Sequence, residues 1–244
     1  MRLIQITDAH LYADKQTRSR AGVPWRHLQR VLQAVITEQP DLVVFSGDIS
    51  QDETAASYTL AYEAMSQLSC PWVWLAGNHD QPALMLETHP LHDEVALPPW
   101  RMLLLHTQVE GGPYGELGQE ALASLSAKLK GDERPTLIVM HHPPVDVGAA
   151  WMDAIGLQDR DAFWDILSAH PQVKVILFGH AHQAYAQHHR VGEHDVAVYG
   201  CPAISDQFMP GAKHFMIDEA SRPGYRIVDL KDQQWDTWIE RVTV

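Results

Sequence analysis

Five short polar clusters in the sequence carry side chains that can bind metal ions. They combine carboxylates, an amide and imidazoles, so they offer oxygen and nitrogen ligands without a thiolate, and such a set suits divalent Mn, Fe or Zn. The candidate ligands are Asp8, His10, Asp48, Asn78, His141, His180 and His182. These seven are too many for one ion, whereas two ions that share a carboxylate use them all. Paired ions of this kind clamp the attacking and leaving oxygens of a phosphoryl displacement.

Each cluster directly follows a segment that is typical of a β-strand. These segments are rich in β-branched and other apolar residues, and they cover residues 2–7, 41–46, 71–75, 135–140 and 173–178. Apolar residues at helical spacing predict helices over 25–38, 54–68, 81–87, 117–130 and 158–169. Alternating strands and helices indicate βαβ units and an α/β fold. Because ligands bind beyond the carboxyl ends of parallel strands, the five clusters are expected to converge on one place.

The rest of the sequence adds strands to this pattern. A loop is expected over 88–100, which holds three prolines, and a strand over 101–106. Beyond residue 184 the sequence becomes strand-rich, with strands predicted over 184–190, 194–199, 213–217, 224–230 and 235–242. This tail indicates a mixed or second sheet. No linker or internal repeat divides the sequence, so residues 1–244 are predicted to form a single domain.

The composition restricts the partners. The formal net charge is −13, from 18 Lys plus Arg against 31 Asp plus Glu. A net-acidic surface repels polyanions, so neither nucleic acid nor an anionic membrane is an expected partner. No apolar run reaches the roughly 20 residues of a membrane helix, and no signal peptide is recognised at the start. With only Cys70 and Cys201, a disulfide framework is excluded and a cytoplasmic location is expected.

The order of the clusters resembles that of the calcineurin-like metallophosphoesterases. The five blocks are Asp-x-His, Gly-Asp, Gly-Asn-His-Asp, His-His-Pro-Pro and Gly-His-x-His, and the likeness extends from residue 3 to about 217. The intervening residues are similar to one branch, the bacterial class III cyclic-AMP phosphodiesterases, in the stretches 5–11, 47–52, 74–80, 151–153 and 179–183. The resemblance implies a four-layer α/β/β/α sandwich, which agrees with the strand-rich tail.

The resemblance also implies how the ligands are divided. One metal ion would be held by Asp8, His10 and His182, and the other by Asn78, His141 and His180. Asp48 would bridge the two ions. The metal itself stays open among Fe, Mn and Zn, because these ligands accept several divalent ions.

The same resemblance implies that a histidine next to Asn78 in the sequence takes part in catalysis. His79 would face the phosphate and act as general acid for the leaving oxygen, with Asp80 orienting it and with Asn78 and His79 contacting the substrate. The implied reaction is hydrolysis of 3′,5′-cyclic AMP to 5′-AMP by attack of a hydroxide that bridges the metal ions. An imidazole with an ordinary pKa of about 6.5 is suited to protonate the departing ribose oxygen.

Two other functions compete with this one. The first is a broader phosphodiesterase that acts on 2′,3′-cyclic nucleotides or other small phosphodiesters, and the second is a non-catalytic binding scaffold on the same fold. The sequence departs from the cyclic-AMP enzymes at Asp159 and at Ala203, and both stretches are expected to border the nucleotide. His142 is interpreted as structural, and Trp151 is a candidate for the substrate site. A small phosphodiester, in first place a cyclic nucleotide, is the expected partner, and a homodimer is left open.

Overall fold

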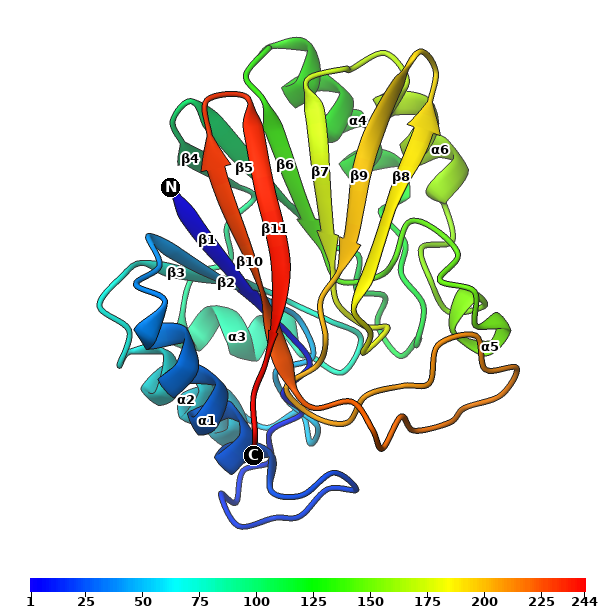
Figure 1. The fold of residues 1–244 in the computed structure, drawn as a ribbon. Coiled ribbons are helices and arrows are strands. Elements are labelled where there is room, and N and C mark those ends of the chain that lie inside the picture. The colour runs from blue at the N-terminus through cyan, green and yellow to red at the C-terminus, as the bar shows by residue number, and fades with distance from the viewer.

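The computed structural model describes residues 1–244, which form two β-sheets with helices outside them (Figure 1). The first sheet has five strands in the order β11-β10-β1-β2-β3. Its parallel part consists of β1 (Arg2–Ile6), β2 (Leu42–Ser46) and β3 (Trp72–Leu75), and the antiparallel part of β10 (Gly224–Lys231) and β11 (Gln234–Arg241). The chain therefore returns at its end to pair with its first strand.

The second sheet has six strands in the order β4-β5-β6-β7-β9-β8. Its central strands run parallel and are β5 (Trp100–Leu105), β6 (Thr136–Met140), β7 (Val173–Phe178) and β9 (His194–Gly200). The antiparallel strands β4 (Glu94–Leu97) and β8 (Tyr185–Val191) form its two edges. β6 is buried at every position and β7 at all but Lys174, as expected for parallel strands that are covered on both faces.

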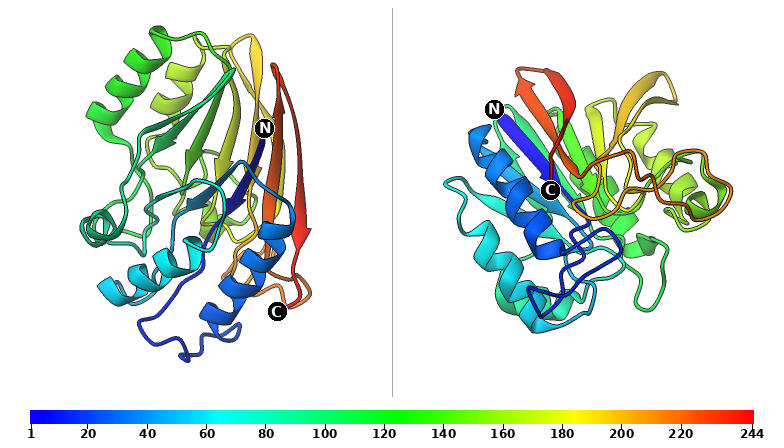
Figure 2. Two further views of the ribbon diagram at one scale, coloured as in Figure 1. Left: turned by 90° about the vertical axis from the view of Figure 1, so that its left-hand side faces the viewer. Right: turned by 60° about the horizontal axis from the view of Figure 1, so that its bottom comes forward.

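Three apolar cores separate four layers of structure. One core packs the first sheet against α1 (Pro24–Thr37), α2 (Ala55–Met65) and α3 (Pro82–Thr88), and a second packs the other sheet against α4 (Gly118–Lys130), α5 (Ala150–Asp153) and α6 (Arg160–Leu167). The third core lies between the two sheets. Figure 2 shows the helices on the outer sides of the paired sheets. The predicted α/β/β/α arrangement is confirmed.

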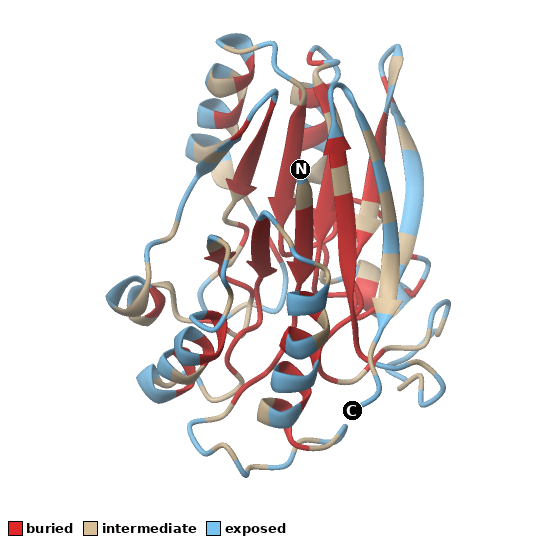
Figure 3. Ribbon diagram, turned by 60° about the vertical axis from the view of Figure 1, so that its left-hand side comes forward, coloured by how far each residue is buried: buried red, intermediate tan, exposed pale blue.

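The helices cover the sheets with one face only. In α1 the buried positions Leu28, Val31, Leu32 and Val35 follow the helical period, and Pro24 occupies the first turn, where its missing N–H costs nothing. Figure 3 shows the same division in the helices in front of the sheets, which carry buried residues on one side and exposed residues on the other. None of these helices has the length and apolar character needed to cross a membrane.

Two sequence predictions about the strands are wrong. The expected loop over 88–100 contains β4, because Pro98 and Pro99 occupy only the turn between β4 and β5 and leave both strands free to pair. The strand expected over 213–217 does not form. That segment makes only an isolated bridge between Phe208 and Ile217, and its Phe215 lines a cavity. The short helix α5 has no counterpart among the predicted elements.

Candidate metal centre

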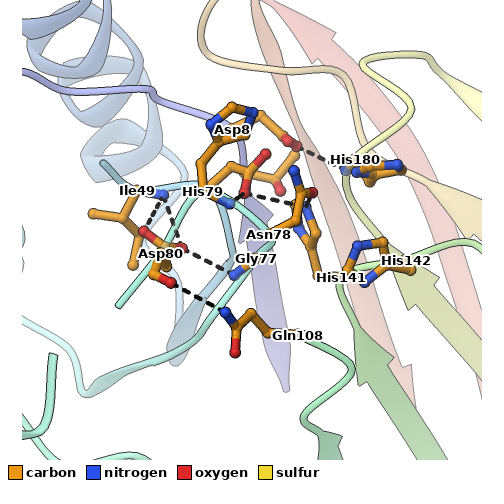
Figure 4. Close-up of polar contacts among 12 residues, drawn as sticks. Asp8, Ile49, Gly77, Asn78, His79, Asp80, Gln108, His141, His142 and His180 are labelled. Carbon is orange, nitrogen blue, oxygen red and sulfur yellow. Dashed lines mark hydrogen bonds and ion pairs between the residues drawn. The ribbon is translucent and has the colours of Figure 1, made fainter. Parts of the chain in front are cut away.

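The five polar clusters meet where the carboxyl ends of β1, β2, β3, β6 and β7 come together (Figure 4). Hydrogen bonds between the two sheets keep these strand ends together. The amide nitrogen of Gln5 donates to Ser46 Oγ at 2.8 Å and to the Phe178 carbonyl at 3.0 Å, which links three strands. The backbone N–H of His180 donates to Asp8 Oδ2 at 3.1 Å. The convergence that strand order predicted is confirmed.

The side chains form one continuous group of nitrogen and oxygen donors. His182 Nε2 lies 3.3 Å from Asp8 Oδ1 and 3.3 Å from His10 Nε2. His141 Nε2 lies 3.2 Å from Asn78 Oδ1. Asp48 stands between these two sets, because its Oδ2 lies 3.6 Å from His10 Nε2 and its Oδ1 lies 3.4 Å from His141 Nε2. Each carboxylate oxygen of Asp48 therefore faces a different half of the group.

Six of the seven ligand residues are buried and Asn78 is half-buried, and some of their donor atoms have no partner in the protein. Asp8 Oδ1 and His180 Nε2 are both shielded from solvent, and neither atom makes a hydrogen bond. Leaving such atoms unsatisfied costs about 1–3 kcal/mol each. A pair of bound cations would satisfy them, so the residues present fit divalent metal ions.

Hydrogen bonds at Nδ1, the ring nitrogen that faces away from the centre, set the orientation of two imidazoles. His141 Nδ1 donates to the Ser46 carbonyl at 2.8 Å, and His182 Nδ1 donates to the Asp206 carbonyl at 2.6 Å. Because a carbonyl only accepts, Nδ1 of each ring carries a proton, and Nε2 is the atom that faces the centre and would bind an ion once it is deprotonated. The Phe208 ring also stacks on the ring of His182, with centroids 4.0 Å apart and planes inclined by 6°. These contacts orient the rings before any ion binds.

The backbone at the clusters is strained. Positive φ angles occur at five of the seven candidate ligands, with Asp8 at 55°, His10 at 50°, Asp48 at 50°, His180 at 61° and His182 at 50°. Residues with a side chain avoid this region, and such strain concentrates at functional sites. Gly77 shows how tightly the loops approach, because a Cβ there would lie 2.2 Å from Asp48 Oδ1. No pattern in the sequence predicts these conformations.

Burial and mutual charge divide the histidines into two kinds. Burial lowers the pKa of His10 to about 4, and burial together with the nearby His141 lowers that of His180 to about 3. At His141, burial also opposes protonation, but the Asp48 carboxylate outweighs it and raises the pKa to about 9. The carboxyl pKa of Asp48 stays well below its usual value despite burial, because His141 stabilises the carboxylate. Metal ions bind neutral imidazoles, so His10 and His180 already have the binding form. His141 must release a proton when it binds an ion.

His79 and Asp80 have different surroundings. His79 lines the cavity above the centre, its backbone N–H donates to Asp48 Oδ1 at 2.9 Å, and its Nδ1 lies 3.5 Å from the amide nitrogen of Gln51. The Asp80 carboxylate accepts hydrogen bonds from the backbone N–H groups of Ile49 and Gly77 and makes none to the ring of His79 (Figure 4). The expectation that Asp80 orients the imidazole therefore has no contact to support it, and Gln51 takes that place.

A cavity of about 450 Å³ opens over the centre. Trp151 lines it, as expected, together with residues that the sequence did not single out: Tyr12, Arg20, Phe208 and Phe215. These four lie in irregular loops and belong to no motif, so no pattern in the sequence marks them.

The remaining candidates lie outside this cavity. Neither Asp159 nor Ala203 borders the cavity, because Asp159 accepts from the N–H groups of Leu117 and Gly118 at the start of α4 and Ala203 is fully buried. These two residues therefore do not line the cavity, although the nearby Ile155 and Ser205 do. His142 is buried beside His180, and Thr107 Oγ1 lies 2.8 Å from its Nδ1.

Comparison with known proteins identifies the class to which this fold and site belong. The profile of the calcineurin-like phosphoesterases matches residues 1–184. The chain belongs to this family of metallophosphoesterases. Among curated relatives, it is 34% identical to the 3′,5′-cyclic adenosine monophosphate phosphodiesterase CpdA of Pseudomonas aeruginosa, over 98% of this chain and 89% of that protein. It is 35% identical to CpdA of Escherichia coli K12, over 94% and 85%, and 36% identical to a probable cyclic nucleotide phosphodiesterase of Synechococcus, over 98% and 92%.

Solved structures share the fold at lower sequence identity. A dimetal phosphatase from Danio rerio superimposes with a TM-score of 0.69 at 15% identity, covering 99% of both chains. A purple acid phosphatase from yellow lupin superimposes with a TM-score of 0.66 at 12% identity, covering 98% of this chain and 51% of that one. These likenesses support the two-sheet fold.

Proposed function

We propose that this chain is a two-metal phosphodiesterase that hydrolyses 3′,5′-cyclic AMP to 5′-AMP. The observation that carries the proposal is the group of seven nitrogen and oxygen ligands, six of them buried and Asn78 half-buried, beneath a cavity that also exposes His79. Two of the ligand atoms, Asp8 Oδ1 and His180 Nε2, have no hydrogen-bond partner. The choice of substrate rests on relatives about 35% identical over most of the chain, whose names give this activity.

The donors divide naturally into two sets around one carboxylate. Asp8, His10 and His182 would hold one ion, and Asn78, His141 and His180 the other. Asp48 would bridge the ions, since its two oxygens face the two sets separately. Two such ions, when bound, offset the charge of the phosphate and lower the pKa of water toward neutrality.

The protein's own residues then position and protonate the ester. The Asn78 oxygen faces His141, which leaves its amide nitrogen to donate to a phosphate oxygen. The Gln51 amide donates to His79 Nδ1, so in the neutral ring the proton lies on Nε2. During hydrolysis, the water oxygen bonds to phosphorus and loses a proton to solvent, and the bond from phosphorus to the ribose 3′ oxygen breaks. His79 in its protonated form gives the Nε2 proton to that oxygen and is left as the neutral ring, which takes up a proton from solvent before the next turnover.

The test is hydrolysis by metal-stripped protein reconstituted with Mn, Fe or Zn. The substrates are 3′,5′-cyclic AMP, 3′,5′-cyclic GMP, 2′,3′-cyclic AMP and an aryl phosphodiester. A clear preference for the 3′,5′-cyclic nucleotides supports the proposal. Faster turnover of 2′,3′-cyclic AMP or the aryl ester would keep the two-metal chemistry and reject the substrate.

Two histidine variants separate catalysis from scaffolding. His79→Ala is expected to lower kcat by about 10²–10⁴-fold, the usual contribution of general acid catalysis, while metal content stays unchanged. His188→Ala, at an exposed position of β8, is the matched control and should retain full activity. A loaded wild-type protein without phosphodiesterase activity on any of these esters would favour a binding scaffold.

A further inference from the structure

The cavity over the metal centre has a polar end and an aromatic end. Asn78 and His79 line the polar end, where the phosphate would lie, together with three candidate ligands: His10, His180 and His182. Trp151, Phe208 and Phe215 line the other end. A volume of about 450 Å³ lies within the range of small-molecule sites, so the cavity can hold more than a phosphate group.

The three aromatic rings form one connected cluster. The centroids of Trp151 and Phe208 lie 5.3 Å apart, those of Trp151 and Phe215 lie 5.3 Å apart, and those of Phe208 and Phe215 lie 5.2 Å apart. Trp151 comes from α5 and the phenylalanines from the long loop between β9 and β10, which runs beside α5 (Figure 1). Because Phe208 also stacks on His182, the cluster begins at the metal centre and extends away from it.

Arg20 packs against the aromatic cluster from a third segment, the loop between β1 and α1. Its guanidinium carbon lies 4.8 Å from the centroid of the Phe215 ring, and its Nη1 lies 3.1 Å from Asp206 Oδ2. The carbonyl of Asp206 in turn holds the ring of His182. The aromatic end is thus tied to the same loop that orients a candidate ligand, which fixes its distance from the reacting phosphate.

The surface that this end offers consists of aromatic rings that meet edge to face, with interplanar angles of 63°, 77° and 71°. Nε1 of Trp151 is fully buried without a partner, although the residue is partly exposed, so the accessible part of the indole is carbon. Phe215 is 49% exposed, with Arg20 over its ring. A ligand group that fits such a surface is itself flat and aromatic, since stacking requires a π-face and no hydrogen-bond pattern.

We propose that Trp151 and Phe215, backed by Phe208 and Arg20, bind the nucleobase of the substrate by stacking and so select nucleotides over phosphodiesters that lack an aromatic group. This inference rests on the proposed phosphodiesterase function and assigns the residues that recognise the substrate. Because stacking does not read the edges of the base, 3′,5′-cyclic AMP and 3′,5′-cyclic GMP should have similar KM values.

The test compares two substrates that share the reacting phosphate. One is 3′,5′-cyclic AMP, and the other is methyl riboside 3′,5′-cyclic phosphate, which carries no base. Removal of the base should raise KM for the metal-loaded wild-type enzyme by about 5- to 150-fold, the range for one base stacked on an aromatic side chain. Trp151→Ala should raise KM for cyclic AMP within that range and leave kcat and the KM for the base-free substrate unchanged.

Further variants separate stacking from a structural role. Trp151→Phe should restore the KM for cyclic AMP, and Phe215→Ala, at an exposed position, should raise it without loss of folding. Trp238→Ala is the control, because this exposed tryptophan lies on β11 and does not line the cavity. The proposal is overturned if Trp151→Ala and Phe215→Ala leave the KM for cyclic AMP unchanged, or if they raise the KM of both substrates equally.

Failure of the base-stacking proposal can be distinguished from failure of the proposed phosphodiesterase function. If the loaded wild-type enzyme does not hydrolyse cyclic AMP, the proposed function fails, and the subsite is then tested by calorimetric binding of 5′-AMP and ribose 5-phosphate. Tighter binding of 5′-AMP that is lost in Trp151→Ala supports base stacking. Equal affinities for the two ligands reject it.

Discussion

Asp80 is the residue whose removal should damage the centre most without deleting a metal ligand. It is 1% exposed, and its carboxylate accepts hydrogen bonds from the N–H groups of Ile49 at 3.1 Å, Ser50 at 3.0 Å and Gly77 at 2.9 Å. The Tyr58 hydroxyl donates to it as well, at 3.2 Å. Asp80 therefore joins the loop that carries Asp48 to the loop that carries Asn78.

The cost of Asp80→Ala follows from these donors. Four buried donors lose their acceptor, and an unsatisfied buried donor costs about 1–3 kcal/mol. At the low end of that range the variant loses about 4 kcal/mol of unfolding free energy, a large part of the roughly 5–15 kcal/mol that stabilises a typical domain. Asp80→Asn keeps the shape and one acceptor oxygen, so its loss should be about half as large.

Urea unfolding of the metal-stripped protein measures this effect without interference from bound ions. The midpoint should fall in the order wild type, Asp80→Asn, Asp80→Ala, with the slope unchanged. Asp165→Ala, at an exposed position of α6, is the control and should leave the midpoint unchanged. A loss below about 1 kcal/mol for Asp80→Ala would refute the assigned role, because that is less than one unsatisfied donor costs.

Three further predictions concern the centre itself. Gly77→Ala should lose bound metal and activity, because the new Cβ would lie 2.2 Å from Asp48 Oδ1. The control Gly131→Ala should retain both, because its new Cβ has its nearest neighbour at 3.6 Å. Elemental analysis and turnover measure the difference, and full metal content in Gly77→Ala would contradict the geometry. Gln51→Leu should lower kcat for cyclic AMP with metal content unchanged, since His79 Nδ1 loses its donor; an unaltered kcat would show that the contact does not orient the ring. Metal at 100 times its Kd should raise the unfolding free energy by about 2.7 kcal/mol, and a chelator should reverse this gain. Calorimetric melting measures both effects. A melting temperature that does not change with added metal would contradict the binding of ions to the folded state.

The sequence predicted the centre better than it predicted the cavity above it. Asp8, Asp48 and His180 each follow a strand of buried apolar residues, so strand order alone was enough to bring them together. Asp80 lies beside His79 in sequence, yet its carboxylate turns toward backbone donors of another loop. Adjacency in sequence does not determine which way a buried carboxylate points.

The aromatic end of the cavity could not be predicted, for a physical reason. Phe208 and Phe215 lie in a loop without periodicity, and their positions depend on contacts with Trp151 and Arg20 from distant segments. The apolar residues near 215 predict a strand, because β-propensity does not distinguish a strand from a loop that packs on an aromatic cluster. In the same way, the prolines near 98 obscured β4, since a single turn absorbs both of them.

The most direct test of the account is a titration of metal-stripped protein with Mn²⁺, followed by hydrolysis of 3′,5′-cyclic AMP and by elemental analysis of bound metal. The account predicts that activity is absent from the stripped protein, rises with added metal and saturates at two ions per chain. Full turnover by the stripped protein, or saturation at a single ion, would contradict it.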